Sequence, residues 1–389
     1  MKIGIIGGGI AGCAVAHLIA RDTNHDVTIF EASPRLGAGN RTEWWAGHPY
    51  TFGPRHFLTQ FTDVFEYFNK LVPLRLHSSH EFKTFVERDD AFYNYPINIQ
   101  DIDRMPDKEK INAELKSASQ NKEKNVKSAR NLKEYWLASV GQTLFSKFID
   151  DYNKKMWLVD DCSEIDTFSW SPKGAAIKDG ERAAWSEAIS AYPYARDGYN
   201  AYFAIASADA KVRCSTPVSH IDFENKAIVT ETDSTRFDIV INTLSPDIIF
   251  QNCYGRLRFL GRDLLKVVLP VEQCLPDDIY FLYYANSEPF TRIVEYKKFT
   301  HHVSPNTLIG LEIPSENGRF YPMPFKADIA LSNRYFDEMP DWMYSIGRMG
   351  SYRYDVDIDD SIKQAMLIVR DIKSASYSGP VPALDLPRL

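Results

Sequence analysis

The chain has 389 residues and a formal net charge of −7, and 44% of its residues are hydrophobic. Its 23 Phe, 21 Tyr and 7 Trp residues provide enough apolar area for a large core, which argues against a disordered or fibrous protein. At about 150 residues per domain, the length predicts two or three domains, or one domain with large insertions. No run of basic residues interleaved with aromatic residues is present, so we expect no nucleic-acid partner.

Five cysteines lie far apart without a C-x-x-C pair: Cys13, Cys162, Cys214, Cys253 and Cys274. Their spacing predicts free thiols in a reducing compartment, neither a disulfide framework nor a metal site, and hence a cytoplasmic protein. The apolar residues 3–20 could be read as a signal peptide, but their glycines and His17 would weaken an export helix. No other stretch approaches the roughly 20 apolar residues of a membrane span, so we expect no membrane insertion.

The predicted elements begin with a strand, a helix and a second strand. Residues 2–6 form a β-type run, a glycine-rich turn opens a helix that reaches about Arg21, and residues 26–31 form the second strand. Alternation over residues 82–97 then predicts a hairpin whose turn carries two aspartates.

Further along the chain, apolar residues at helical spacing predict a helical domain over residues 98–165. Residues 169–182 contain many small residues and a proline, which predicts a mobile loop. Strand patterns return from residue 212 and are mostly antiparallel over residues 255–330. An amphipathic helix is expected at 359–372.

The first turn carries a G-x-G-x-x-G pattern between a strand and a helix, the context that a dinucleotide site requires. Gly7 permits a tight turn, Gly9 lets the backbone approach a pyrophosphate at the helix N-terminus, and Gly12 allows close helix–strand packing. Glu31, at the end of the second strand, would accept hydrogen bonds from ribose hydroxyls. The pattern predicts a bound dinucleotide; a glycine turn that binds no nucleotide is the alternative.

The glycine pattern does not distinguish FAD from NAD. Residues 36–42 form a second glycine-bearing turn that resembles the extended flavin fingerprint of the glutathione reductase and amine oxidase class. Residues 240–247, with Asn242 and Thr243, resemble the later strand with which that class returns to the nucleotide domain. The resemblance implies FAD and an α/β fold, in which a Rossmann-like FAD-binding domain is joined by a helical insertion domain and an antiparallel β-sheet domain.

We therefore expect four parts along the chain. They are a discontinuous FAD-binding domain at 1–80, 205–250 and 335–373; a helical substrate domain at 98–165 with the mobile loop 169–182; a sheet domain at 81–97, 183–204 and 251–334; and a loose tail at 374–389.

A set of short strings follows the glycine loop in a fixed order: FGPRHFLT at 52–59, YNYPIN at 93–98, YNKKMW at 152–157, FTRIVEYK at 290–297, FYP at 320–322, GRM at 347–349 and YRY at 352–354. Each is unspecific, but the ordered set resembles the UDP-galactopyranose mutase family. The resemblance implies an isomerase that interconverts the pyranose and furanose forms of a nucleotide-linked sugar. The reaction passes through an adduct between the sugar and N5 of reduced FAD, without net redox change.

The same resemblance implies the cofactor, partners and pathway. FAD is needed in its reduced form, so an external reductant such as NAD(P)H is expected. The partner is a nucleotide-diphosphate sugar, in galactofuranose-containing cell-surface polysaccharide biosynthesis, and a homodimer is left open.

Residue roles are carried over only where this sequence matches the family's strings. Arg292 matches the arginine that holds the substrate pyrophosphate, and Tyr321 and Tyr354 match phenols that donate to it. The other substrate-binding candidates are Asn94, Tyr152, Trp157, Lys178, Arg182 and Arg262. The cofactor-binding candidates are Gly7, Gly9, Ile10, Ala11, Gly12, Glu31, Ala32, Gly39, Asn40, Arg55, His56, Val218, Arg348 and Asp357.

Some of these residues could instead have purely structural roles. Tyr152 and Trp157 lie five positions apart in an apolar helix and would be core residues by default. Arg292 could form an exposed cross-strand pair, and Tyr321, before a proline, could pack in a loop.

The sequence departs from the family at two places. The strand beside the flavin usually reads G-x-H-x-F-H-T, whereas this chain has Arg55 and Leu58 at the histidine positions and a displaced His56. An alanine lies near the position of the family's mobile-loop arginine, and Lys173, Lys178 and Arg182 are the candidates to replace that arginine. A further family arginine corresponds to Arg258 or Arg262.

These departures predict a mutase that acts on a different nucleotide sugar. Two alternatives from other classes remain: an amine-oxidase-like FAD enzyme that carries out a net oxidation, and a non-catalytic FAD-binding scaffold.

Overall fold

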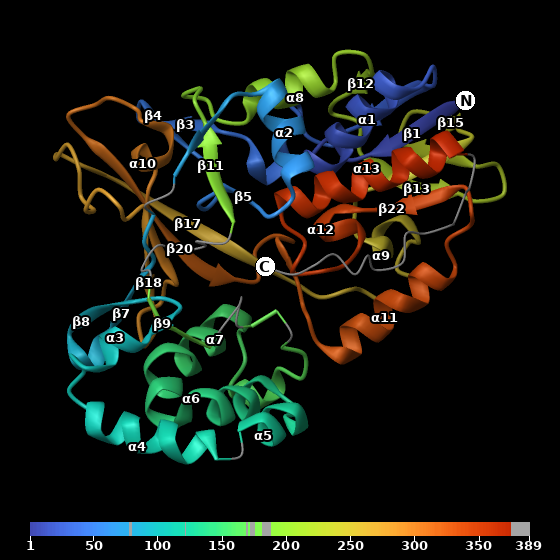
Figure 1. The fold of residues 1–389 in the computed structure, drawn as a ribbon. Coiled ribbons are helices and arrows are strands. Elements are labelled where there is room, and N and C mark those ends of the chain that lie inside the picture. The colour runs from blue at the N-terminus through green and yellow to red at the C-terminus, as the bar shows by residue number, and fades with distance from the viewer. Residues whose placement is uncertain (78–79, 121, 169, 172–175, 181–187, 375–389) are drawn as a thin grey trace.

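The computed structural model describes residues 1–77, 80–120, 122–168, 170–171, 176–180 and 188–374. A parallel five-stranded sheet contains the N-terminal strand and confirms the predicted strand–helix–strand unit (Figure 1). Its order is β12 (Lys211–Arg213), β2 (Asp26–Phe30), β1 (Lys2–Ile6), β16 (Ile239–Asn242) and β22 (Met343–Ser345). The α/β fold class predicted from the sequence is therefore correct.

Both faces of this sheet are covered, as parallel sheets require. Ile3 and Ile5 point to a core shared with α1 (Ile10–Asp22) and α13 (Ile358–Ser374). Ile6, at the end of the same strand, joins the core on the other face. The helices on the first face also include α2 (Thr62–Leu71) and α8 (Asn200–Ala206). The second face is covered by β13 (Val218–Asp222), β14 (Ala227–Thr230), β15 (Ser234–Arg236), α9 (Pro246–Ile249) and α11 (Lys326–Asp337).

A second, seven-stranded sheet lies beside the first. Its order is β21 (Tyr321–Pro322), β17 (Phe259–Leu269), β20 (Thr307–Ser315), β19 (Arg292–Glu295), β18 (Phe281–Tyr284), β7 (Lys83–Val86) and β8 (Ala91–Asn94). All pairs are antiparallel except β18 with β7, which is parallel. The predicted hairpin at 82–97 is the pair β7 and β8.

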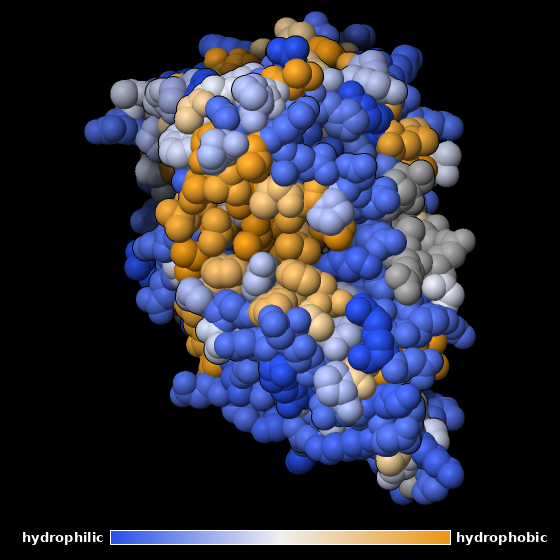
Figure 2. Space-filling view, turned by 90° about the vertical axis from the view of Figure 1, so that its left-hand side faces the viewer, coloured by the Kyte–Doolittle hydropathy of each residue, from blue (hydrophilic) through white to orange (hydrophobic). Residues whose placement is uncertain are grey.

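The two faces of the seven-stranded sheet differ. Strand alternation places Arg292 and Glu312 on one face and Leu265, Val267 and Phe92 on the other. The last three side chains are 53%, 38% and 41% exposed. Figure 2 shows a continuous apolar area on the side of the molecule where this sheet lies.

Helices form the third part of the chain, below the sheet in Figure 1. They are α3 (Ile99–Ile102), α4 (Lys108–Ser119), α5 (Lys122–Ser128), α6 (Leu132–Phe148) and α7 (Asp150–Trp157). Buried aromatic and aliphatic side chains such as Trp136, Val140 and Leu144 give α6 its inner face. Within the described part of the chain, no helix is both long and apolar enough to cross a membrane, and all five cysteines are free.

Some segments lie elsewhere than expected. β11 (Ile189–Pro193), predicted within the large antiparallel sheet, instead pairs with β5 (Phe57–Thr59) and β6 (Leu74–Leu76) in a separate three-stranded sheet. Alternation predicts a strand but not its partner, so its sequence could not reveal this pairing. Within the predicted mobile loop, β10 (Ile177–Lys178) pairs with β9 (Ile97–Asn98).

Other residues of that loop (169, 172–175, 181 and 182) and of the tail (375–389) lie outside the described residues. The remaining domain boundaries stay a prediction.

One buried cation joins the helical part to the seven-stranded sheet. Lys147 in α6 has no exposed side-chain surface and forms ion pairs with Asp89, in the β7–β8 turn, and with Asp107 Oδ2 at 2.9 Å. The Tyr93 hydroxyl also donates to Asp89, at 2.9 Å. Lys147 therefore fixes the position of the helices relative to the hairpin.

We expect Lys147→Met to destabilise the protein by about 3–5 kcal/mol, because it leaves a buried carboxylate without its cation. Urea unfolding followed by far-UV circular dichroism measures the loss. Lys127→Met is the matched control, since Lys127 forms an ion pair with Glu123 on the surface and should change stability by less than about 0.5 kcal/mol. Equal effects of the two substitutions would contradict this role for Lys147.

Candidate active site

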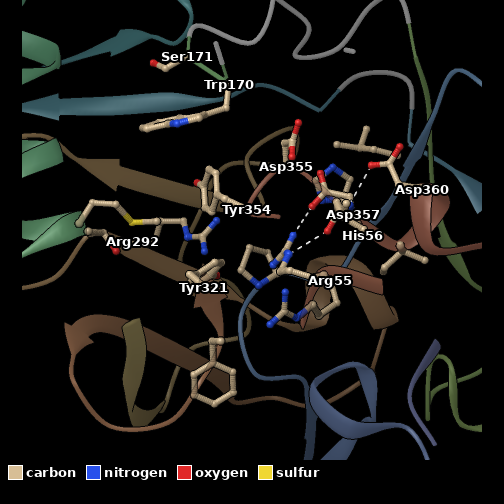
Figure 3. A pocket seen from close by; sticks show the side chains of 18 of the residues that line it. Arg55, His56, Trp170, Ser171, Arg292, Tyr321, Tyr354, Asp355, Asp357 and Asp360 are labelled. Atoms are coloured by element: carbon tan, nitrogen blue, oxygen red, sulfur yellow. Dashed lines mark hydrogen bonds and ion pairs between the residues drawn. The ribbon is translucent and has the colours of Figure 1, made fainter. Parts of the chain in front are cut away.

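A cavity of about 470 Å³ lies where the parallel sheet, the seven-stranded sheet and the helical part meet (Figure 3). The predicted site residues that line it are Ile10, Gly39, Asn40, Arg55, His56, Tyr152, Arg292, Tyr321, Arg348, Tyr354 and Asp357. They come from segments far apart in the sequence, and the fold brings them to one place.

The N-terminus of α1 forms one end of this site. Gly7 has a φ of +99°, which side chains rarely adopt, and a Cβ atom at Gly12 would overlap the Gly7 carbonyl oxygen. Gly9 is different, because a Cβ atom there would lie 3.6 Å from Ala38 and meet no closer atom. Gly9 precedes α1 without a side-chain cap. An open backbone at an uncapped helix N-terminus suits a pyrophosphate, so these residues fit a dinucleotide cofactor.

Glu31 lies directly beside this turn. Its Oε2 accepts a hydrogen bond from the Gly8 amide at 2.7 Å, and its Oε1 accepts from the amide and hydroxyl of Ser33. The Gly37 amide donates to the Gly8 carbonyl at 2.8 Å, which joins the second glycine turn to the first. Gly39 and Asn40 follow in the short helix η1 (Ala38–Asn40) and face the cavity. The predicted flavin segment is therefore continuous with the glycine loop.

Acidic residues gather where α13 begins. Asp355, Asp357, Asp359 and Asp360 all line the cavity. Arg348, in α12 (Gly347–Gly350), forms an ion pair with Asp357 and donates from Nε to the Val356 carbonyl at 2.8 Å. Arg348 and Asp357, both predicted as cofactor-binding residues, therefore lie together.

Asp359 is 2% exposed. Burial, followed by the charges of Asp360 and Asp357, raises the pKa of its carboxyl to about 7. The carboxyl is therefore partly protonated near neutral pH.

On the opposite side of the cavity, Arg292 is held by a carboxylate. Its Nη2 and Nε atoms donate to Glu312 Oε2 at 2.6 and 3.1 Å. Burial by itself would lower the pKa of Arg292, but the Glu312 charge raises it well above its ordinary value. Glu312 was missed from the sequence; the register that places it opposite Arg292 is visible only once β19 and β20 are paired.

Tyr321 lies among arginines. The guanidinium carbons of Arg262 and Arg348 are 4.5 and 5.4 Å from its ring centroid. Burial would raise the pKa of the Tyr321 phenol, but Arg55, Arg292 and Arg262 together lower it below its ordinary value. The phenol is thus a stronger hydrogen-bond donor than a free tyrosine.

An aromatic group closes the cavity beside Tyr321. Tyr354 has ring contacts with Tyr321 at 5.8 Å, Trp157 at 4.8 Å and Trp170 at 5.2 Å. Trp157 is 1% exposed and supports Tyr354 from behind rather than lining the cavity. Tyr152 does line the cavity, and its ring contacts Tyr283 at 5.8 Å.

Several predicted residues are not brought to the cavity wall. Asn94 donates to Asp101 Oδ2 at 2.8 Å. Asn94 is paired with Lys83, the residue before the cavity-lining Thr84. Because side chains alternate along a strand, Asn94 lies on the face of the sheet that points away from the cavity. Arg262 is buried behind Tyr321 and donates to Gly261 O and Met156 Sδ.

Lys178, in β10, also lies outside the lining. Ala32 and Val218 lie beyond it on the Glu31 side. Arg182 lies outside the described residues.

The two glycines of the first turn give a matched pair of tests. We expect Gly12→Ala to destabilise the protein even without cofactor, because its Cβ would meet backbone. Gly9→Ala should keep the wild-type melting temperature without cofactor and lose FAD affinity by at least about tenfold, since its methyl group would occupy the space beside the helix terminus. Thermal unfolding and FAD titration measure both effects, and tight FAD binding by Gly9→Ala would contradict this site.

The raised pKa of Asp359 predicts a pH dependence. In the unfolded chain its pKa is near 4, so the folded state binds the extra proton and is favoured at low pH. This stability is lost as pH rises from about 4 through 7. Asp359→Asn removes the carboxyl that must ionise while buried. The melting temperature of this variant relative to wild type should therefore rise between pH 5 and pH 8 at saturating FAD. A difference that stays constant with pH would show that the carboxyl does not titrate in this range.

Comparisons with known proteins agree with this geometry. A family model described as UDP-galactopyranose mutase matches residues 147–354, more than half of the chain, and a model of an NAD(P)-binding Rossmann-like domain matches residues 5–71. The dTDP-fucopyranose mutase of Escherichia coli is 23% identical over 402 residues, which cover 96% of this chain and 99% of that protein.

Solved structures show the same fold. Reduced UDP-galactopyranose mutase superposes with a TM-score of 0.80 at 16% identity, covering 96% of this chain and 94% of that one. Putrescine oxidase bound to putrescine gives 0.58 at 13% identity, covering 96% and 99%. The family expected from the ordered strings is confirmed by the family model: the chain belongs to the UDP-galactopyranose mutase family.

Proposed function

We propose that the protein interconverts the pyranose and furanose forms of a nucleoside-diphosphate sugar with reduced FAD as its cofactor. The observation that carries this proposal is the cavity itself, which has two separate places suited to anions. One is the uncapped N-terminus of α1 beside Gly9, and the other is the group of Arg292 and Tyr321. A dinucleotide cofactor and a diphosphate-linked substrate require two such places.

The side chains on the substrate side have distinct roles in this proposal. Arg292, fixed by Glu312, offers a guanidinium to the departing diphosphate. Tyr321 and Tyr354 donate hydrogen bonds to the same group, and the lowered pKa of Tyr321 strengthens its bond as negative charge develops. Tyr152 offers an aromatic face to the base.

The cofactor side supports the second half of the proposal. Reduced FAD, when bound, supplies a nucleophilic nitrogen for the anomeric carbon of the sugar. Gly9 and the α1 N-terminus would hold its pyrophosphate, and Arg348, fixed by Asp357, would add a cation. We propose NAD(P)H as the external reductant. The indole rings of Trp157 and Trp170, packed against Tyr354, would exclude water from the reacting sugar.

The identity of the substrate is proposed from the relatives and the departures from the family pattern. The curated relative that spans nearly the whole chain is named for dTDP-fucopyranose, and the family model for UDP-galactopyranose. We propose a dTDP-linked hexose as the first substrate to test. A net oxidation of an amine is disfavoured, because the cavity wall around Tyr321 presents Arg55 and Arg292, which suit an anionic group better than an amine.

A product assay tests this function. The purified, flavin-loaded protein is incubated with dTDP-fucose, UDP-galactose and other nucleotide sugars, with and without dithionite, and the products are separated by chromatography. Furanose product only under reducing conditions is expected. Hydrogen peroxide released from an amine in air, with no furanose from any nucleotide sugar, would support the oxidase instead.

Arg292→Lys provides a residue-level prediction. Lysine keeps the charge but lacks the planar fork of nitrogen donors that can bind a diphosphate and Glu312 together, so kcat/KM should fall about 100-fold while FAD content stays at the wild-type level. Steady-state kinetics and flavin absorbance measure the two quantities. Equal losses of activity and of bound FAD would mean that Arg292 supports the fold rather than the substrate.

A further inference from the structure

Among the arginines that line the cavity, Arg55 is distinct. The others each have an acidic partner: Arg292 with Glu312, Arg319 with Asp247, Arg348 with Asp357 and Arg353 with Asp355. In the part of the chain that the structure describes, Arg55 has no ion pair, and its buried Nε has no hydrogen-bond partner. Arg55 is only partly buried, so its guanidinium can take an anion from outside the chain as the partner that it lacks within it.

The backbone holds Arg55 firmly in the cavity wall. The Tyr199 hydroxyl donates to the Arg55 carbonyl at 2.6 Å, and Pro54 precedes it. Its Nη2 lies 3.7 Å from where a Cβ atom of Gly39 would be. Figure 3 shows the guanidinium near the middle of the cavity, with Tyr321 on one side and Asp357 on the other. Arg55 therefore lies at the boundary between the cofactor side and the substrate side.

Electrostatics indicate which side Arg55 serves. Of the three arginines that lower the pKa of Tyr321 against the effect of burial, Arg55 acts most strongly, ahead of Arg292 and Arg262. Its charge thus reaches the phenol assigned to the substrate. Arg348, which is assigned to the cofactor, is by contrast held by Asp357.

We propose that Arg55 binds the diphosphate of the nucleotide-sugar substrate, as a second arginine fixed in the cavity wall. This inference rests on the proposed function and changes the role expected for Arg55 from the sequence, which placed it with the cofactor. It also gives a role to the arginine at this position, where the family pattern usually has a histidine. A planar guanidinium with free donors can bind a phosphate with two parallel hydrogen bonds.

Binding of nucleoside diphosphates to the flavin-loaded protein tests this assignment. UDP, dTDP and, as phosphate-free controls, uridine and thymidine are titrated while flavin absorbance is followed. Arg55→Met should weaken UDP and dTDP binding by about 10- to 100-fold, as expected for a lost hydrogen bond to a charged group, and leave FAD content and melting temperature unchanged. Arg55→Lys should recover part of the affinity.

Arg353→Met is the matched control. Arg353 also lines the cavity but is paired with Asp355, so its loss should change diphosphate affinity by less than about threefold. Equal weakening by both substitutions would mean that overall cavity charge, and not Arg55, binds the diphosphate. If Arg55→Met loses FAD but keeps its diphosphate affinity, Arg55 binds the cofactor and not the substrate.

The test separates this inference from the proposed function. A wild-type protein that binds UDP or dTDP through Arg55 but forms no furanose would overturn the mutase proposal and support the binding role. A wild-type protein that binds neither diphosphate would overturn both.

Discussion

A guanidinium taken out of water requires a nearby negative charge, and this constraint organises the whole cavity. Two of the paired arginines are fixed by carboxylates from other elements: Glu312 from the neighbouring strand for Arg292, and Asp357 just before α13 for Arg348. These ion pairs hold the cations in defined positions before any ligand arrives. Preorganised charge of this kind is what stabilises a departing anionic group most effectively.

The two sides of the cavity use different parts of the chain. On the cofactor side, the site is formed mainly by backbone amides and by glycines without side chains. Gly9 leaves the α1 terminus open, and Gly12 lets the helix approach the strand. On the substrate side, long side chains from β19 and β21 project into the cavity. In the proposed function, the cofactor therefore depends more on backbone geometry, and the sugar diphosphate depends more on the identity of a few side chains.

This difference explains how much could be predicted from the sequence. The strand–helix–strand unit, the cofactor turn and the α/β class follow from local patterns, and residues carried by ordered strings, such as Arg292 and Tyr321, do line one cavity. The partner of Arg292 and the side served by Arg55 could not be found, because both depend on which strands and loops become neighbours. The same limit applies to Asn94, whose direction follows from pairing with Lys83, and to β11, whose partners are distant in sequence.

The register between β17 and β20 has a consequence for the site. β17 and β20 are paired without a bulge from Gly261 opposite Ser315 to Leu269 opposite Thr307. A slip of one residue would exchange the faces of a strand, moving Glu312 into solvent and an aliphatic neighbour into the cavity. Such a slip is costly because it would leave Arg292, whose side chain is 20% exposed, without its carboxylate partner. The register of two strands thus sets the position of a charge in the cavity.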